Sequence, residues 1–176
     1  MSEKFKGVGI VPARILLPRE DISPTTWAVV ACDQYTSEPA HWEDTALEVG
    51  GAPSTLRLTL PECYLAESES RIPAIHQAMQ DYLQQGFLRT AVEDGFVLTE
   101  RATMQGARVG LVCAVDLEQY DYAAGTKSLV RPTEKTITER LPARMAIRRG
   151  AALETSHIML LMDDPMQSVV EPLYEA

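Results

Sequence analysis

The spacing of apolar residues along the chain predicts two amphipathic helices. The longer one runs over about residues 68–85, where a serine can cap its start and Gly86 follows its end. The shorter one covers HWEDTALEV (41–49), after Pro39 and before a pair of glycines. The apolar residues of the longer helix form one stripe at three- and four-residue spacing: Ile72, Ile75, Met79, Tyr82 and Leu83.

Other apolar segments have the pattern of β-strands. Short apolar runs and strict alternation of apolar and polar residues are both typical of strands with at least one buried face. Such patterns predict four strands, at residues 5–17, Trp27–Cys32 (WAVVAC), Thr55–Leu60 (TLRLTL) and His157–Met162 (HIMLLM).

A hairpin is predicted between residues 96 and 115, around a turn at Gln105-Gly106. This register sets Leu98 opposite Cys113 and Ala102 opposite Val109, so that opposite residues agree in polarity, with Glu100 opposite Leu111 as the exception. The fold class that follows is mixed α/β (α+β). Its sheet is expected to be mixed or mostly antiparallel, with the hairpin inside it and helix 68–85 packed on one face.

The region Thr133–Arg149 is dense in charge and is predicted to be a helix kinked at Pro142. Arginines recur in it every four residues, at Arg140, Arg144 and Arg148, and therefore share one helical face. Guanidinium groups bind phosphate through paired hydrogen bonds, which makes this face a candidate phosphate site. The alternative is a solvated face whose arginines pair with neighbouring glutamates, Glu134 and Glu139.

A second candidate site is the polar loop that follows the predicted strand at Trp27–Cys32. Loops at strand ends commonly carry the functional residues of α/β proteins. The alternative is a turn whose side chains cap the next helix. The candidate residues are Asp33, Gln34, Tyr35, Thr36 and Ser37.

Composition narrows the class of protein. The chain has 176 residues and a net charge of −9, with 45% hydrophobic residues, which predicts a single α/β domain over residues 1–176. An acidic chain is a poor partner for nucleic acid or an anionic membrane. Its sequence contains no apolar run long enough to span a bilayer, so we expect a cytoplasmic protein.

Several familiar chemistries are not indicated. The three cysteines are odd in number and widely spaced, which predicts neither a disulfide framework nor a CxxC metal site. The histidines form no zinc-binding motif, and we expect no bound metal site of that kind. Glycine-rich phosphate-binding motifs of the GxGxxG and GxxxxGK[ST] types are missing as well.

Five short stretches together resemble a known family. They are VVACDQYTS (29–37), APSTL (52–56), AVDLEQYDY (114–122), LVRPTEKTITERLPAR (129–144) and HIMLLMDD (157–164). In this order they are similar to the N-terminal part of proteins called domain of unknown function 1015. The resemblance implies that the chain corresponds to the N-terminal portion of a longer architecture, whose downstream Asp-Gly-Asn/His-His motif this sequence lacks.

The same resemblance implies a distant likeness to the ParB/sulfiredoxin-like superfamily, which includes a free-serine kinase. On that analogy Asp33 would lie in the active cleft as the catalytic residue, with the neighbouring loop residues beside it. The phosphate-binding side would be lined by Arg131, Glu134, Arg140 and Arg144. ATP or ADP with Mg²⁺ would then be the cofactors.

Two functions remain open at this point. The first is a nucleotide- or phosphometabolite-binding domain related to small-molecule phosphoryl transfer, with Asp33 acting as base or metal contact. The second is a noncatalytic binding or assembly module that depends on a missing C-terminal segment or on a partner, including self-association. The two disagree on whether the chain is an enzyme.

Overall fold

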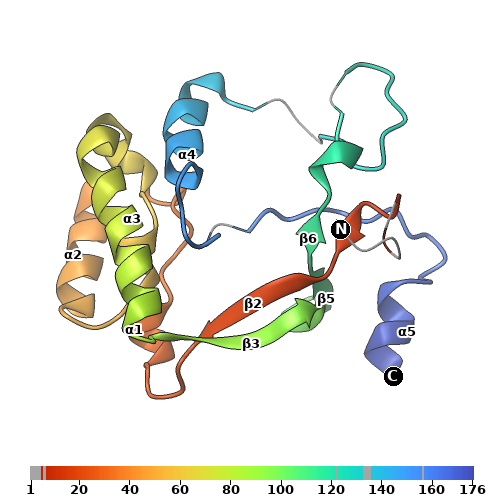
Figure 1. The fold of residues 1–176 in the computed structure, drawn as a ribbon, viewed down its shortest axis with the longest axis horizontal. Coiled ribbons are helices and arrows are strands. Elements are labelled where there is room, and N and C mark those ends of the chain that lie inside the picture. The colour runs from red at the N-terminus through yellow and green to blue at the C-terminus, as the bar shows by residue number, and fades with distance from the viewer. Residues whose placement is uncertain (1–4, 6, 122, 133–135, 156) are drawn as a thin grey trace. The chain divides into compact units, whose positions relative to one another are not determined.

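The chain folds into short helices and paired strands (Figure 1). The computed structural model describes residues 5, 7–121, 123–132, 136–155 and 157–176. Both helices and antiparallel strands are present, which confirms the mixed α+β class. The helices are α1 (Pro24–Trp27), α2 (Pro39–Val49), α3 (Ser68–Gln84), α4 (Leu141–Arg148) and α5 (Val170–Glu175), and the strands are β1 (Ile10–Val11), β2 (Ala13–Pro18), β3 (Leu88–Gly95), β4 (Val97–Thr103), β5 (Gly106–Val112) and β6 (Ala114–Val115).

The chain divides into two compact units. Unit 1 contains residues 1–16, 90–135 and 160–176, and unit 2 contains residues 17–89 and 136–159. The boundaries fall inside β2 and β3, which are hydrogen-bonded neighbours. Since the chain passes between the units several times, neither unit is a continuous stretch of sequence. The expected single domain over residues 1–176 stays a prediction.

Helix α3 supplies the core of unit 2. Its predicted stripe is confirmed at Ile72, Ile75, Met79 and Tyr82, which are buried. Leu83 lies outside this buried set and is exposed. The stripe is covered by α4 and by two 3-10 helices of the same unit, η2 (Thr55–Leu58) and η3 (Glu62–Glu67), rather than by the sheet that the sequence analysis predicts.

The predicted strand at Thr55–Leu60 is wrong, because Ser54 begins a 3-10 helix there. Ser54 is fully buried, and its hydroxyl accepts a hydrogen bond from the backbone N–H of Leu56. Its own backbone N–H donates to the Tyr82 hydroxyl at 2.9 Å, and that hydroxyl donates back to the Ser54 carbonyl at 3.2 Å. The alternating leucines bury Leu58 against α3 without strand pairing.

Two other predicted strands also have no strand structure. The segment Trp27–Cys32 leaves α1 and continues as irregular chain, with the Trp27 carbonyl accepting from the hydroxyls of Ser54 and Thr55. These side chains take the place of a neighbouring strand. His157–Met162 is irregular too. An apolar run becomes a strand only when a second backbone pairs with it, and a sequence pattern cannot supply that partner.

The charged region near α4 differs from its prediction at Pro142. This proline lies in the first turn of α4, directly after the short 3-10 helix η5 (Thr138–Arg140). Backbone N–H groups in the first turn of a helix have no hydrogen-bond partner within the helix, so a proline there costs no hydrogen bond. Pro142 therefore lies at the start of α4 and does not kink it. Residues 133–135, which include Glu134, lie outside the described residues.

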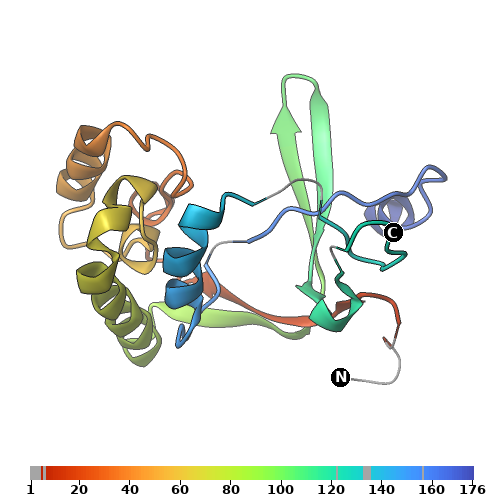
Figure 2. The same cartoon turned by 90° about the horizontal axis from the view of Figure 1, so that it is seen from above.

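The predicted hairpin is present in unit 1 as the antiparallel pair β4 and β5, drawn as a two-stranded ribbon in Figure 2. Leu98 faces Leu111, so the register differs from the prediction by two residues. The turn residues are Met104 and Gln105, and Gly106 follows with a φ of 119°. The Thr103 hydroxyl donates to the Gly106 carbonyl at 2.6 Å and so closes this two-residue turn, one position earlier than predicted.

Replacing Ile75 by Asp tests the packing of α3. An unpaired carboxylate would be buried in the core of unit 2, and we expect the free energy of unfolding to fall by about 3–5 kcal/mol. Urea unfolding followed by circular dichroism measures this loss. Gln80→Asp, on the exposed face of the same helix, is the control and should change stability little. Equal stability of the two variants would show that the stripe is not a core.

Candidate functional site

A buried carboxylate lies between two arginines in unit 2. The side chain of Glu62, at the start of η3, is only 4% exposed. Arg144 donates a hydrogen bond to its Oε1 oxygen. The Nη1 atom of Arg140 lies 2.9 Å from the Oε2 oxygen. The two groups form an ion pair, but their geometry does not meet the criteria of a hydrogen bond. Both arginines therefore converge on one anion, which is part of the protein itself.

Local structure explains how this Glu62 cluster, formed by Glu62, Arg140 and Arg144, is assembled. Arg140 ends η5, and Arg144 lies one turn further along in α4, as the four-residue spacing predicts. Ala143 and Ile147 of α4 pack against the core and so fix the orientation of the helix.

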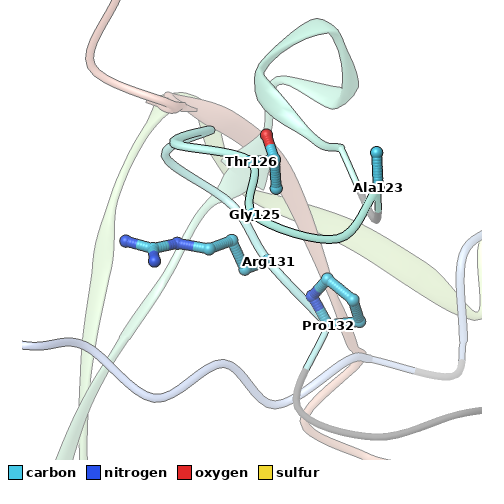
Figure 3. A pocket seen from close by; sticks show the side chains of 5 residues that line it. All are labelled: Ala123, Gly125, Thr126, Arg131 and Pro132. Carbon is cyan, nitrogen blue, oxygen red and sulfur yellow. The ribbon is translucent and has the colours of Figure 1, made fainter.

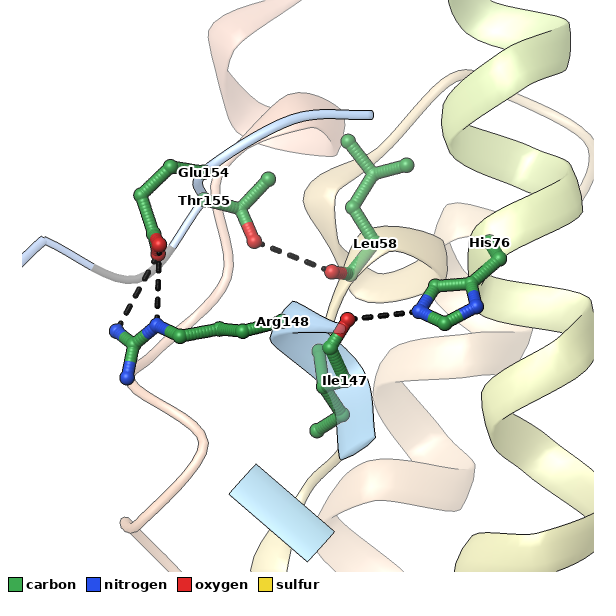
Figure 4. Close-up of polar contacts among 6 residues, drawn as sticks. All are labelled: Leu58, His76, Ile147, Arg148, Glu154 and Thr155. Atoms are coloured by element: carbon green, nitrogen blue, oxygen red, sulfur yellow. Dashed lines mark hydrogen bonds and ion pairs between the residues drawn. The ribbon is translucent and has the colours of Figure 1, made fainter. Parts of the chain in front are cut away.

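Helix α4 is also fixed by polar contacts at its C-terminal end (Figure 4). His76 of α3 lies with its Nε2 atom 2.7 Å from the Ile147 carbonyl. Arg148 donates to both carboxylate oxygens of Glu154, and the Thr155 hydroxyl donates to the Leu58 carbonyl. Arg148 thus pairs with Glu154, whereas Arg140 and Arg144 share Glu62.

The loop around Asp33 is tied to the same cluster. The backbone N–H of Glu62 donates to the Cys32 carbonyl at 2.8 Å. The hydrogen bond that Arg144 donates to Glu62 raises the pKa of Arg144, burial opposes this shift, and the negative charges of Glu62 and Asp33 add to it. Asp33 is therefore close enough to act electrostatically on Arg144.

The remaining loop residues form turns. The N–H of Gln34 donates to the Ala31 carbonyl, and the N–H of Glu38 donates to the Tyr35 carbonyl. Tyr35 has a φ of 51° and stacks on His41 with ring centroids 3.8 Å apart. Thr36 and Ser37 are exposed within the same loop. Helix α2 begins after Glu38, which makes no side-chain capping bond, so the alternative of a capping loop has no support at that position.

Arg131 belongs to unit 1, where it lines a shallow pocket of about 280 Å³ (Figure 3). Backbone turns shape the loop that precedes it: the Asp121 carboxylate accepts from the Ala123 N–H at 2.9 Å, which lowers the pKa of Asp121. Arg140 and Arg144 belong to unit 2, and Glu134 lies outside the described residues. The pocket is lined by Ala123, Gly125, Thr126, Arg131 and Pro132.

Sequence reasoning missed Glu62, the residue that joins the cluster. The available signal was a single acidic residue inside the otherwise apolar stretch LTLPECYL (58–65). A carboxylate in such a stretch is either exposed by a turn or buried with a cationic partner. The partners lie about 80 positions away in the sequence, and no local pattern connects them.

The described residues offer little for metal or thiol chemistry. Among them, no group of three or more His, Cys, Asp or Glu side chains is placed to hold a metal ion. All three cysteines are free thiols, and burial raises the pKa of Cys63 and Cys113 above its ordinary value. A raised pKa disfavours the nucleophilic thiolate. In the part of the chain that the structure describes, no helix is long and apolar enough to cross a membrane.

Comparison with known proteins confirms the family resemblance. The family model described as "Protein of unknown function (DUF1015)" matches residues 10–176. The chain belongs to the DUF1015 family. No curated protein and no solved structure matches the chain. The more distant likeness to ParB/sulfiredoxin-like proteins stays a prediction.

Replacing Glu62 by Gln removes the shared charge from the cluster of this DUF1015 chain. Its arginine partners are more than a third exposed and can be rehydrated, so we expect a loss of about 1–3 kcal/mol in the free energy of unfolding. Glu154→Gln, which breaks the exposed ion pair with Arg148 of α4, should cost at most about 1 kcal/mol. Urea titration of both variants gives the comparison, and a larger loss for Glu154→Gln would contradict the structural role of Glu62.

Proposed function

We propose that this chain binds the phosphate group of a small metabolite or nucleotide at the face formed by Arg140 and Arg144. The observation that supports this function is the convergence of both guanidinium groups on the Glu62 carboxylate. Their side chains are 35% and 40% exposed, so each retains surface for a second, external anion. A guanidinium has five N–H donors, and one carboxylate occupies only some of them.

The charge of the cluster also favours an anion. Two positive groups share one buried negative group, which leaves one positive charge on the surface of a chain whose net charge is −9. Glu62 holds both guanidiniums in place before any ligand arrives. Such preorganisation lowers the entropy cost of binding, because the long side chains are already ordered.

Asp33 gives the proposed site its second property. Its carboxylate acts on Arg144 and would repel a phosphate held by the same arginine. A divalent cation such as Mg²⁺, bound by the phosphates of ATP or ADP, would compensate this repulsion and could be contacted by Asp33. In a phosphoryl-transfer reaction Asp33 would be the base or the metal contact.

A noncatalytic assembly role is supported by a different observation. The apolar residues 158–162 are exposed and have no regular structure. Contiguous exposed apolar surface is typical of interaction sites. This role uses other residues than the phosphate site, so one chain can have both properties.

Isothermal titration with ATP, ADP and phosphoserine, each with and without Mg²⁺, tests phosphate binding. Replacing Arg144 by Gln should weaken the binding of whichever of these ligands binds by about tenfold or more, because a charge-assisted hydrogen bond contributes about 1.5–3 kcal/mol. Arg148→Gln is the matched control on the same helix and should bind like the wild type. Equal affinities of wild type and Arg144→Gln, or no binding of any ligand at millimolar concentration, would overturn the proposal.

Replacing Asp33 by Asn tests the role of its charge. Without Mg²⁺ the variant should bind ADP more tightly than the wild type, by roughly fivefold, because a repulsion of roughly 1 kcal/mol is removed. The gain in affinity that Mg²⁺ gives the wild type should become smaller. The same titrations measure both effects. Weaker metal-free binding by the variant would show that Asp33 supports the anion through hydrogen bonds instead.

A further inference from the structure

A cavity of about 190 Å³ lies within unit 2, between α2 on one side and α1 with the residues that follow it on the other. Among the described residues, no member of the Glu62 cluster and none of the loop residues 33–37 lines it. An engineered apolar cavity of about 150 Å³ holds one benzene molecule. The cavity of unit 2 is therefore large enough for a small organic molecule.

Two hydroxyl groups in the wall of this cavity already donate their protons to the protein. The Thr45 hydroxyl donates to the His41 carbonyl at 2.7 Å, and the Thr26 hydroxyl donates to the Ser23 carbonyl at 3.2 Å. A hydroxyl whose proton is used in this way can only accept a further hydrogen bond. Thr25, which is exposed, adds a third hydroxyl to the lining. The wall is therefore rich in oxygen atoms that accept hydrogen bonds.

Glu48 adds a negative charge to the same wall. His41, Thr45 and Glu48 follow one another at spacings of four and three residues and so share one face of α2. Glu48 is exposed, which places its carboxylate at the mouth of the cavity. Val49 is buried and Val29 is half-buried, so the inner part of the lining is apolar. No lysine or arginine lies among the described residues that line the cavity.

The His41 ring gives the cavity a fixed wall. It stacks on Tyr35 with an angle of 18° between the rings, and it meets the Trp42 ring edge-on at 82°. Tyr35 has a φ of 51°, in the left-handed region that bulky residues rarely adopt, and Trp42 is only 2% exposed. A ring that neighbours hold on two sides is already ordered before a ligand binds, which lowers the entropy cost of binding.

We propose that this cavity binds a small aliphatic primary ammonium ion. An ammonium group has N–H donors and no acceptor, which complements the oxygens of Thr26, Thr45 and Glu48. The hydrocarbon part of the ligand would pack on the apolar side chains of Val29 and Val49. An anion of the same size would meet the Glu48 carboxylate and would find no cationic side chain in the described lining. The inference does not rest on the proposed phosphate site.

NMR titration of the whole, isotope-labelled chain with n-pentylammonium tests the proposal. The titration is made at about pH 8, where alkylammonium ions are charged and imidazoles are ordinarily neutral. The backbone amide signals of residues 25–30 and 41–49 should shift in a saturable way. Pentanoate and pentanol, which carry a carboxylate or a hydroxyl in place of the ammonium group, are the ligand controls. Each should bind at least about tenfold more weakly, because each lacks a charge-assisted hydrogen bond to Glu48.

Variants of α2 locate the binding. Glu48→Gln removes the charge and should weaken n-pentylammonium binding by about fivefold or more. Glu43→Gln is the matched control, since Glu43 is an exposed glutamate of the same helix that does not line the cavity. Thr45→Val removes one acceptor at nearly constant shape and should also weaken binding. Circular dichroism confirms that each variant is folded.

Three results would each overturn the proposal: no saturable shift in the wild type, equal binding of pentanoate, or equal affinities of Glu48→Gln and Glu43→Gln. Arg144→Gln should bind n-pentylammonium like the wild type, and Glu48→Gln should bind phosphate ligands like the wild type. These two comparisons separate a failure of the ammonium site from a failure of the phosphate site.

Discussion

The arrangement of unit 2 depends on one buried carboxylate. Burying Glu62 takes a charge out of water at a cost of several kcal/mol, and the ion pairs with Arg140 and Arg144 offset that cost. A charge in this position tolerates few alternative arrangements, because any movement of α4 would leave it unpaired. The Glu62 cluster and the packing of Ala143 and Ile147 against the core together fix which face of α4 points away from the core, and the Glu62 backbone N–H holds the Cys32 carbonyl beside the start of η3.

The packing around α3 makes this arrangement possible. Its apolar stripe is covered by segments that are not strands, and each of these segments needs its own polar anchors. The Ser54 hydroxyl donates to the Trp27 carbonyl, which links α1 to the start of η2. The Tyr82 hydroxyl bonds both the N–H and the carbonyl of Ser54. The His76 ring bonds the Ile147 carbonyl in the last turn of α4. Buried polar groups that are paired in this way specify one packing among the many that apolar contacts alone would permit.

The proposed phosphate site and the apolar stretch at residues 158–162 differ in physical character. The face formed by Arg140 and Arg144 is a local positive region on an acidic chain, and the phosphate binding proposed for it would act through charge-assisted hydrogen bonds. Residues 158–162, by contrast, carry no charge. Salt should therefore weaken the proposed phosphate binding by screening.

The sequence by itself determined the elements whose signal is local. The stripe of α3, the extent of α2, the presence of the β4–β5 hairpin and the four-residue spacing of Arg140 and Arg144 all follow from periodicity within a few turns. The family also follows from the sequence, because its short motifs occur in order along the chain.

Only the tertiary structure decided which apolar runs become strands and which carboxylate the arginines meet. The apolar runs at Trp27–Cys32 and Thr55–Leu60 lack strand pairing, since the Trp27 carbonyl accepts bonds from side chains and the second run begins as a 3-10 helix. The hairpin register moved by two residues because its two-residue turn lies one position earlier, at Met104 and Gln105, where the Thr103 hydroxyl bonds the Gly106 carbonyl. Glu62 meets its arginines across about 80 residues of chain, and such a contact is set by packing rather than by any local pattern.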